Sequence, residues 1–216
     1  ANGHDYVDLG LPSGTLWATC NVGADSPEEY GDHFAWGETE PKSYCTWSTY
    51  KWMTEGMSAW YGVNKYTFDD GQGTAVWYSS FSGFIGDNKT MLELSDDAAY
   101  VNWGSSWRMP TKGELDELGN TNYTTWTCTT QNGVVGYKVT SKKNGNSIFL
   151  PAAGYRDDSS DLLHAGSRGS YWSSSLSTLN SNNACSLNFR SSDVGSSSSS
   201  NALRFYVRSV RPVLRW

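Results

Sequence analysis

Residue types that could perform acid–base or nucleophilic chemistry are present in this sequence, but their spacing matches no catalytic pattern. The three histidines, His4, His33 and His164, lie far apart, and none belongs to an HExxH metal motif. The segment 10–14 places its serine one position away from the centre of the G-x-S-x-G nucleophile elbow. We therefore expect a non-enzymatic protein. A secreted hydrolase, with a Ser-His-Asp triad assembled in space, is the less favoured alternative.

Acidic clusters at 69–73, 95–97 and 157–161 offer oxygen atoms that could bind calcium. None has the spacing of an EF-hand loop, so solvated carboxylates in turns are the preferred interpretation. We expect no cofactor, with calcium as the alternative. The sequence also has four cysteines without zinc-ligand spacing: Cys20, Cys45, Cys128 and Cys185. Because Cys20 lies in an apolar stretch, it is expected to be a buried free thiol.

The segment 173–210 differs from the rest of the chain in composition. It contains 14 serines and 5 asparagines in 38 residues, which on composition alone is typical of a flexible linker. However, apolar residues recur at strand-like spacing, at Leu187 and Phe189 and again at Leu203, Phe205 and Val207. This alternation favours strands attached to a core, with polar loops between them.

Five residue types are missing from the same segment: Lys, Glu, Gln, Met and Trp. At the composition of the rest of the chain, about seven such residues would be expected in a window of this length. Replacing the two adenines of an Asn codon, AAC or AAT, can give Ser, Tyr, Phe, Cys, Leu, Arg and other types, but none of the missing five. Residues that interrupt the Ser/Asn pattern, such as Leu179, Arg190 and Phe205, all belong to the reachable set. The pattern indicates adenine-directed mutagenesis.

This pattern resembles that of the variable proteins of diversity-generating retroelements, which have a C-type lectin-like fold. Motifs along most of the chain also resemble the paralogous surface-protein domain of gut Bacteroidetes and Fibrobacter. They are YVDLGLPSGTLWATCNVGA at 6–24, FAWGET at 34–39, SWRMPT at 106–111, GSYWSSS at 169–175 and SVRPV at 209–213. The resemblance implies an α+β, loop-rich fold with small antiparallel sheets, few short helices, and paired N- and C-terminal strands.

The resemblance implies a ligand-binding module of the adhesin or receptor-binding type with a hypervariable surface. Its partner would be a protein or glycan on another cell or surface. We expect aromatic and Arg side chains to supply most of the affinity. The candidate ligand-binding residues are Leu179, Asn180, Ser181, Cys185, Arg190, Ser191, Ser196, Ser198, Asn201, Leu203, Arg204, Phe205, Tyr206 and Arg208.

Some apolar residues of the segment are better explained as core. Leu187, Phe189, Val194 and Val210 are expected to be buried, and Phe205 or Val207 would join them if their strand has the opposite face inward. A calcium-dependent lectin would carry an EPN or QPD tripeptide and a WND triplet, which this sequence lacks. A non-diversified surface or fimbrial tip protein is the alternative from another class.

Length and charge set further bounds. The 216 residues are expected to form a single domain, with 1–172 as scaffold, 173–210 as the candidate variable region and 209–216 as the closing strand. The net charge of −6 argues against a nucleic-acid partner. Segment 173–210 carries three Arg against one Asp, a weakly basic patch that could favour an anionic partner or be only solvated. No apolar run is long enough to span a membrane.

The chain begins without Met, and we expect a processed or excised piece that is exposed at a cell surface, secreted or carried on a phage particle. The remaining signals are local. Thr111 with Glu114 predicts a capping box for a helix that ends near Gly119. Asn132-Gly133 and Asn144-Gly145 predict two hairpin turns. Strands are expected at 6–9 and 15–22, with 6–9 beside 210–214 and long loops from 24 to 100.

Overall fold

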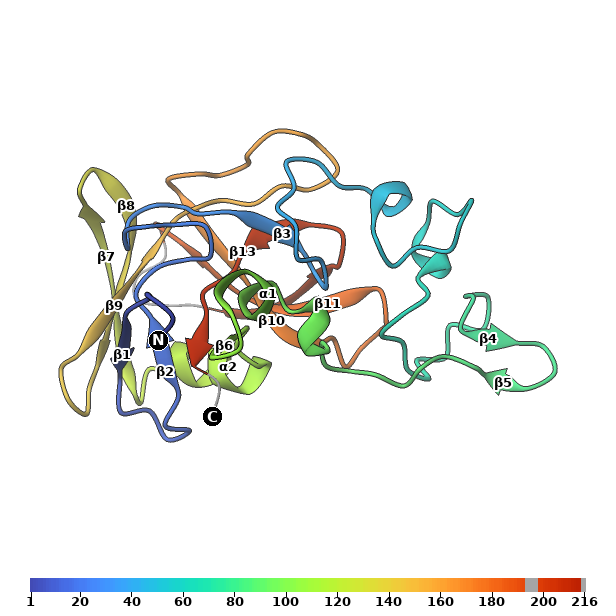
Figure 1. The fold of residues 1–216 in the computed structure, drawn as a ribbon, viewed down its shortest axis with the longest axis horizontal. Coiled ribbons are helices and arrows are strands. Elements are labelled where there is room, and N and C mark those ends of the chain that lie inside the picture. Colours follow the sequence, from blue (N-terminus) through green and yellow to red (C-terminus); the bar gives the residue numbers. More distant parts are fainter. Residues whose placement is uncertain (193–197, 215–216) are drawn as a thin grey trace.

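The computed structural model describes residues 1–192 and 198–214. About a third of the residues, 33%, are in strands and 11% are helical, so loops carry much of the chain, as Figure 1 shows. The fold is a loop-rich α+β arrangement of small antiparallel and mixed sheets with a few short helices, in agreement with the coarse expectation.

The chain ends meet in one four-stranded sheet. Its order is β1 (Tyr6–Asp8), β2 (Leu16–Ala18), β14 (Val213–Leu214) and β6 (Trp107–Arg108). The expected direct pairing of the first and last strands is wrong, because β2 lies between them and pairs with both. The turn at 10–15 folds β2 back onto β1, so β2 occupies the place next to β14.

The serine-rich segment supplies most of the central sheet. The order of this sheet is β12 (Ser198–Leu203), β11 (Asn183–Arg190), β10 (Arg168–Leu176), β13 (Val207–Ser209) and β3 (His33–Ala35). Strands β10, β11 and β12 pair antiparallel in sequence, and β13 returns parallel to β10. Most of the described part of the segment is therefore sheet, with turns between the strands, and the linker interpretation is wrong for it.

Two α-helices lie between β3 and β10 in the described chain. Helix α2 (Lys112–Gly119) has the expected capping box, in which Thr111 accepts from the Glu114 N–H and Glu114 accepts from the Thr111 N–H. The helix is capped at its C-terminus by Asn120, whose φ is −77°. Gly119 is therefore the last helical residue and does not end the helix by adopting a left-handed conformation. Helix α1 (Ala98–Trp103), capped by Asp97, was not expected.

The remaining elements lie at opposite ends of the long axis (Figure 1). Strands β7 (Thr124–Gln131), β8 (Val134–Ser141) and β9 (Ser147–Pro151) form a meander. Asn132 and Gly133, with φ of 47° and 82°, make its first two-residue turn as expected. The second connection is longer than two residues. Toward the other end lie the hairpin of β4 (Tyr78–Ser79) and β5 (Gly83–Phe84) and the 3₁₀ turns 47–49 and 60–62, whereas the 3₁₀ turn 94–96 lies beside α1.

The core is built from large rings. One cluster joins α2 and the β7–β9 sheet to the inner face of the central sheet, where Leu187 and Phe189 are buried. A second cluster contains Trp36, Trp107 and Trp172, each fully buried. The expected burial of Leu187, Phe189 and Val210 is confirmed, whereas Val194 lies outside the described residues. All four cysteines are free, and Cys20 is only half-buried.

Buried His33 on β3 makes stability depend on pH. Burial lowers its pKa to about 4, although its ring Nε2 lies 3.1 Å from the Ala153 carbonyl oxygen. Above pH 6.5 both the folded and the unfolded chain hold this histidine neutral. As the pH falls from 6.5 to 4, the unfolded chain takes up a proton that the folded chain does not, and stability is lost, up to about 3 kcal/mol.

We therefore expect His33→Gln to remove part of the acid-induced loss of stability. Urea unfolding at pH 7.5 and pH 5 measures it, with His164→Gln, on an exposed loop, as the control. The wild type should lose more unfolding free energy between the two pH values than His33→Gln does. Equal losses in wild type, His33→Gln and His164→Gln would contradict the expectation.

Candidate functional site

The central sheet divides the serine-rich segment into two faces. Along β11, Leu187 and Phe189 point into the core, whereas Ser186 and Asn188 hydrogen-bond Arg208 on the other side of the sheet. Arg190, the last residue of β11, is exposed. Alternation at period two therefore directs Leu187 and Phe189 to the core and Ser186 and Asn188 to buried contacts with Arg208. Arg190 is the one residue of β11 that is exposed.

The candidate ligand-binding residues fall into different environments. Leu179, with 71% of its surface exposed, and the side chains of Arg190 and Asn201 are open to solvent. The half-buried candidates are Asn180, Ser191, Leu203 and Tyr206. The buried candidates are Ser181, Cys185, Arg204, Phe205 and Arg208. Ser196 lies outside the described residues, and Ser198 is described only as part of the β12 backbone.

Arg204, expected to supply affinity, is fully buried and ties loops together. Its Nε donates to the Tyr50 hydroxyl at 3.1 Å, and its Nη1 donates to the carbonyl oxygens of Tyr66 and Ser181 at 3.0 Å. The guanidinium also lies 4.9 Å from the centre of the Trp36 ring. Because these groups fill its surroundings, Arg204 serves to hold the turn after β12 in place.

Other buried candidates have similar structural contacts. The Phe205 ring packs against Trp47, with centroids 4.8 Å apart. Ser181 accepts from the Phe68 N–H through its hydroxyl and donates its own N–H to Asp70. Burial raises the pKa of the Cys185 thiol, which disfavours the reactive thiolate. Without local rearrangement, none of these side chains can meet a macromolecular ligand.

Arg208 differs from Arg204 because it borders a cavity. Its Nη1 donates to the Ser186 hydroxyl at 2.8 Å and to the Asn188 side-chain oxygen at 3.0 Å. Its guanidinium lies 4.8 Å from the centre of the Trp172 ring. The adjoining cavity, of about 340 Å³, opens between β10, β11, β12 and β13 and is named here the arginine pocket. Its lining residues are Arg168, Asn188, Phe189, Arg190, Ser200, Asn201 and Arg208.

The arginine pocket contains both expected and unexpected residues. Arg190, Asn201 and Arg208 were candidates, and the structure brings them together. Arg168, Asn188 and Ser200 were missed. Arg168 directly precedes the GSYWSSS motif, and the β10–β11 register pairs it with Arg190. Predicting a β-hairpin that begins at that motif could have placed Arg168 next to the following strand. Its pairing with Arg190, however, depends on a strand register that is not evident from the sequence.

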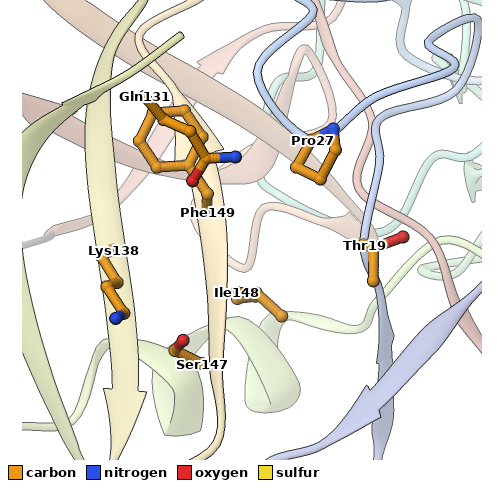
Figure 2. A pocket seen from close by; sticks show the side chains of 7 residues that line it. All are labelled: Thr19, Pro27, Gln131, Lys138, Ser147, Ile148 and Phe149. Atoms are coloured by element: carbon orange, nitrogen blue, oxygen red, sulfur yellow. The ribbon is translucent and has the colours of Figure 1, made fainter.

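A second hollow lies between β2 and the β7–β9 meander (Figure 2). It has a volume of about 240 Å³ and is lined by Thr19, Pro27, Gln131, Lys138, Ser147, Ile148 and Phe149. Figure 2 shows these side chains spread around the hollow rather than converging on one point. Lys138 is its single ionisable lining group, so this hollow has no cluster of groups that would recognise a ligand.

Carboxylates in the acidic clusters, where calcium binding was the alternative, accept hydrogen bonds from other groups of the chain. Asp70 accepts from the Trp77 indole N–H and the Ser181 N–H. Asp96 accepts from the Tyr66 hydroxyl and pairs with Lys65 at 2.6 Å. Within residues 1–192 and 198–214, no three His, Cys, Asp or Glu residues are grouped so that they could hold a metal ion. These carboxylates therefore act as ties between loops in the structure.

The three histidine rings are held by aromatic or backbone groups. His4 stacks on Trp103 with centroids 3.6 Å apart, and His164 stacks on Tyr155 at 5.9 Å. His33 faces the Ala153 carbonyl oxygen. Each ring thus has a packing contact or backbone contact that accounts for its position.

Neither a protein-family model, nor a curated protein, nor a solved structure matches this chain. In the described portion of the chain, no helix is both long enough and apolar enough to cross a membrane.

Proposed function

We propose that this chain is a non-enzymatic binding module with a C-type lectin-like scaffold. Residues 1–172 and the closing strand form the scaffold, and the outer face of β10–β13 with its adjoining loops displays a surface diversified by retroelement mutagenesis. The resemblance of the motifs to variable proteins and to bacterial surface-protein domains supports this proposal. Such a module would act outside the cell, at a cell surface or on a phage particle.

One observation carries the proposal: a segment with the composition expected from adenine-directed mutagenesis contains both packed core positions and solvent-exposed positions. Phe189 is 2% exposed, whereas the next residue, Arg190, is exposed. A diversified site needs this separation, because substitutions at open positions leave the packed core unchanged. Leu179, Arg190, Asn201 and Tyr206 are the open or half-open side chains on which a ligand would rest.

The experiment is a binding screen followed by paired variants. The purified chain is screened on immobilised polysaccharides and bacterial surface proteins, and each binder is retested with the triple variant Leu179→Ala, Asn201→Ala, Tyr206→Ala. The control is Thr125→Ala with Thr127→Ala, exposed positions of β7 in the scaffold. We expect the triple variant to weaken binding at least tenfold and the control to change it less than twofold. Absence of any binder, or equal binding by all three proteins, would overturn the proposal.

One observation favours the alternative of a structural or tip protein. The β4–β5 hairpin carries Phe81, which is 98% exposed, and is followed by Ile85 at 55%. Exposed apolar side chains on a projecting hairpin are typical of assembly contacts. If this alternative holds, light scattering should detect an oligomer that Phe81→Ser dissociates. A monomer at all concentrations would exclude assembly through this hairpin.

A further inference from the structure

Arg208 is a buried cation whose hydrogen-bond partners among the described residues are neutral. Only 3% of its surface is exposed, and its hydrogen bonds go to Ser186 and Asn188. Its Nε has no hydrogen-bond partner among residues 1–192 and 198–214. Burial, and then the charge of Arg168, lower its pKa to about 9. A buried charge without a counter-ion is costly, so the site favours an anion that would complete it.

Two more guanidinium groups gather at the same pocket. The Arg168 Nε is also buried without a partner in the described chain. The guanidiniums of Arg168 and Arg208 lie 4.9 Å and 5.6 Å from the centre of one ring, that of Tyr155. Arg190 stands opposite Arg168 in the strand register and lines the open part of the pocket. Like charges brought together in this way repel one another unless an anion lies between them.

No carboxylate among the described residues offsets this charge. None lines the arginine pocket, and no ion pair joins Arg168, Arg190 or Arg208 to a described Asp or Glu. Asp157 and Asp158 lie on the neighbouring loop. Burial is the main cause that raises the pKa of Tyr206, and the negative charges of these two residues add to it. The pocket thus offers three guanidinium groups, those of Arg168, Arg190 and Arg208, to an incoming oxygen anion.

The rest of the lining identifies the kind of molecule that would carry the anion. Asn188, Ser200 and Asn201 surround the guanidiniums with neutral amide and hydroxyl groups. Such groups hydrogen-bond sugar hydroxyls in both directions, as donors and acceptors. The cavity, at about 340 Å³, is within the size range of small-ligand sites. A sugar ring with one carboxylate and several hydroxyls matches this lining, whereas an acidic peptide side chain would leave the neutral groups unused.

We propose that the arginine pocket binds the carboxylate of an acidic sugar of the uronic acid class. This inference rests on the proposed function and names the ligand class of the same face. The carboxylate lies against the guanidinium groups of Arg168 and Arg208 that line the pocket. Arg190 closes over it from the exposed end of β11, and the sugar hydroxyls bond Asn188, Ser200 and Asn201.

Calorimetry of the full chain with trigalacturonate tests this inference. The comparison ligands are galactotriose, which lacks the carboxylates, and hexaglutamate, which carries them on a peptide. Arg190→Gln and Arg168→Gln each remove one pocket cation at a side chain that is not fully buried. Lys143→Gln removes the same charge from the exposed β8–β9 turn and is the matched control.

We expect trigalacturonate to bind in 50 mM salt, with a dissociation constant that rises at least tenfold in Arg190→Gln and in Arg168→Gln. Lys143→Gln should change it less than twofold, and galactotriose should not bind. The inference is overturned if galactotriose binds equally, if hexaglutamate binds as tightly as trigalacturonate, or if the Arg variants match Lys143→Gln. If it fails while the triple variant of the open face still loses another ligand, the proposed function stands.

Asp193 needs its own variant because it is the one carboxylate of segment 173–210 and lies outside the described residues. Asp193→Asn is expected to bind trigalacturonate at least as tightly as the wild type. Binding by Asp193→Asn alone would overturn the inference, since the pocket's anion would then belong to the chain itself.

Discussion

Replacing Arg211 by Met is expected to lower the free energy of unfolding by about 3–5 kcal/mol, because several buried acceptors are left without a donor. Arg211 is 1% exposed and connects three parts of the chain. Its Nε donates to the Asn21 side-chain oxygen at 2.9 Å, its Nη1 to the carbonyl oxygens of Ala18 and Thr19, and its Nη2 to the Phe149 carbonyl oxygen at 2.9 Å. Met fills much of the space but donates no hydrogen bond, so these buried acceptors lose their partners.

Urea unfolding and thermal melting measure this loss. For a chain of this size, the expected loss corresponds to a fall in melting temperature of roughly 10 °C. Lys138→Met is the control, because Lys138 is an exposed cation on β8 and its replacement should change stability by less than about 0.5 kcal/mol. A loss below about 1 kcal/mol in Arg211→Met would show that this network does not stabilise the junction between β2 and the β7–β9 meander.

The second large effect is expected at Phe189, inside the serine-rich segment. Phe189→Ala should destabilise the chain by about 3–5 kcal/mol, because its ring is 2% exposed and packs against three others. The ring centroids of Trp126, Tyr137 and Tyr171 lie 5.7, 5.1 and 6.0 Å away. Removing the ring leaves a cavity between β11 and the β7–β9 meander that these rigid neighbours cannot fill.

The adjacent residue provides the matched control. Arg190→Ala removes an exposed side chain from the same strand and should change the unfolding free energy by less than about 0.5 kcal/mol. Urea unfolding of both variants compares them directly. Similar losses at positions 189 and 190 would contradict the distinction between the packed residue Phe189 and the exposed end of β11 at Arg190, on which the proposed site depends.

Features set by local chemistry could be predicted from the sequence. Thr111 and Glu114 cap α2 as expected, because a capping box needs only residues three positions apart. Asn132 and Gly133 fix the β7–β8 turn for the same kind of reason. Helix α1 was missed because it has only six residues. The 95–97 cluster was interpreted as solvated turn carboxylates, with calcium binding as the alternative, although Asp97 caps this helix.

Features set by distant partners could not be predicted. The sequence places Arg204 and Arg208 in a polar segment, where arginines are ordinarily exposed, but Tyr50 and Tyr66 from the loops before β4 enclose Arg204. Likewise, the position of β2 between β1 and β14 depends on a long-range pairing choice. The alternation of Leu187 and Phe189 was sufficient to locate the sheet, but not to tell which arginines border a pocket.

The gene and its flanking DNA provide the most direct test of a diversified binding face. We predict a near-identical copy of the segment that encodes 173–210, beside a reverse transcriptase gene, with differences confined to adenines of that copy. The altered codons should be enriched at open positions such as Leu179 and Asn201 and depleted at core positions such as Phe189. A flank without such a copy, together with codons in this segment that show no adenine bias, would contradict the account.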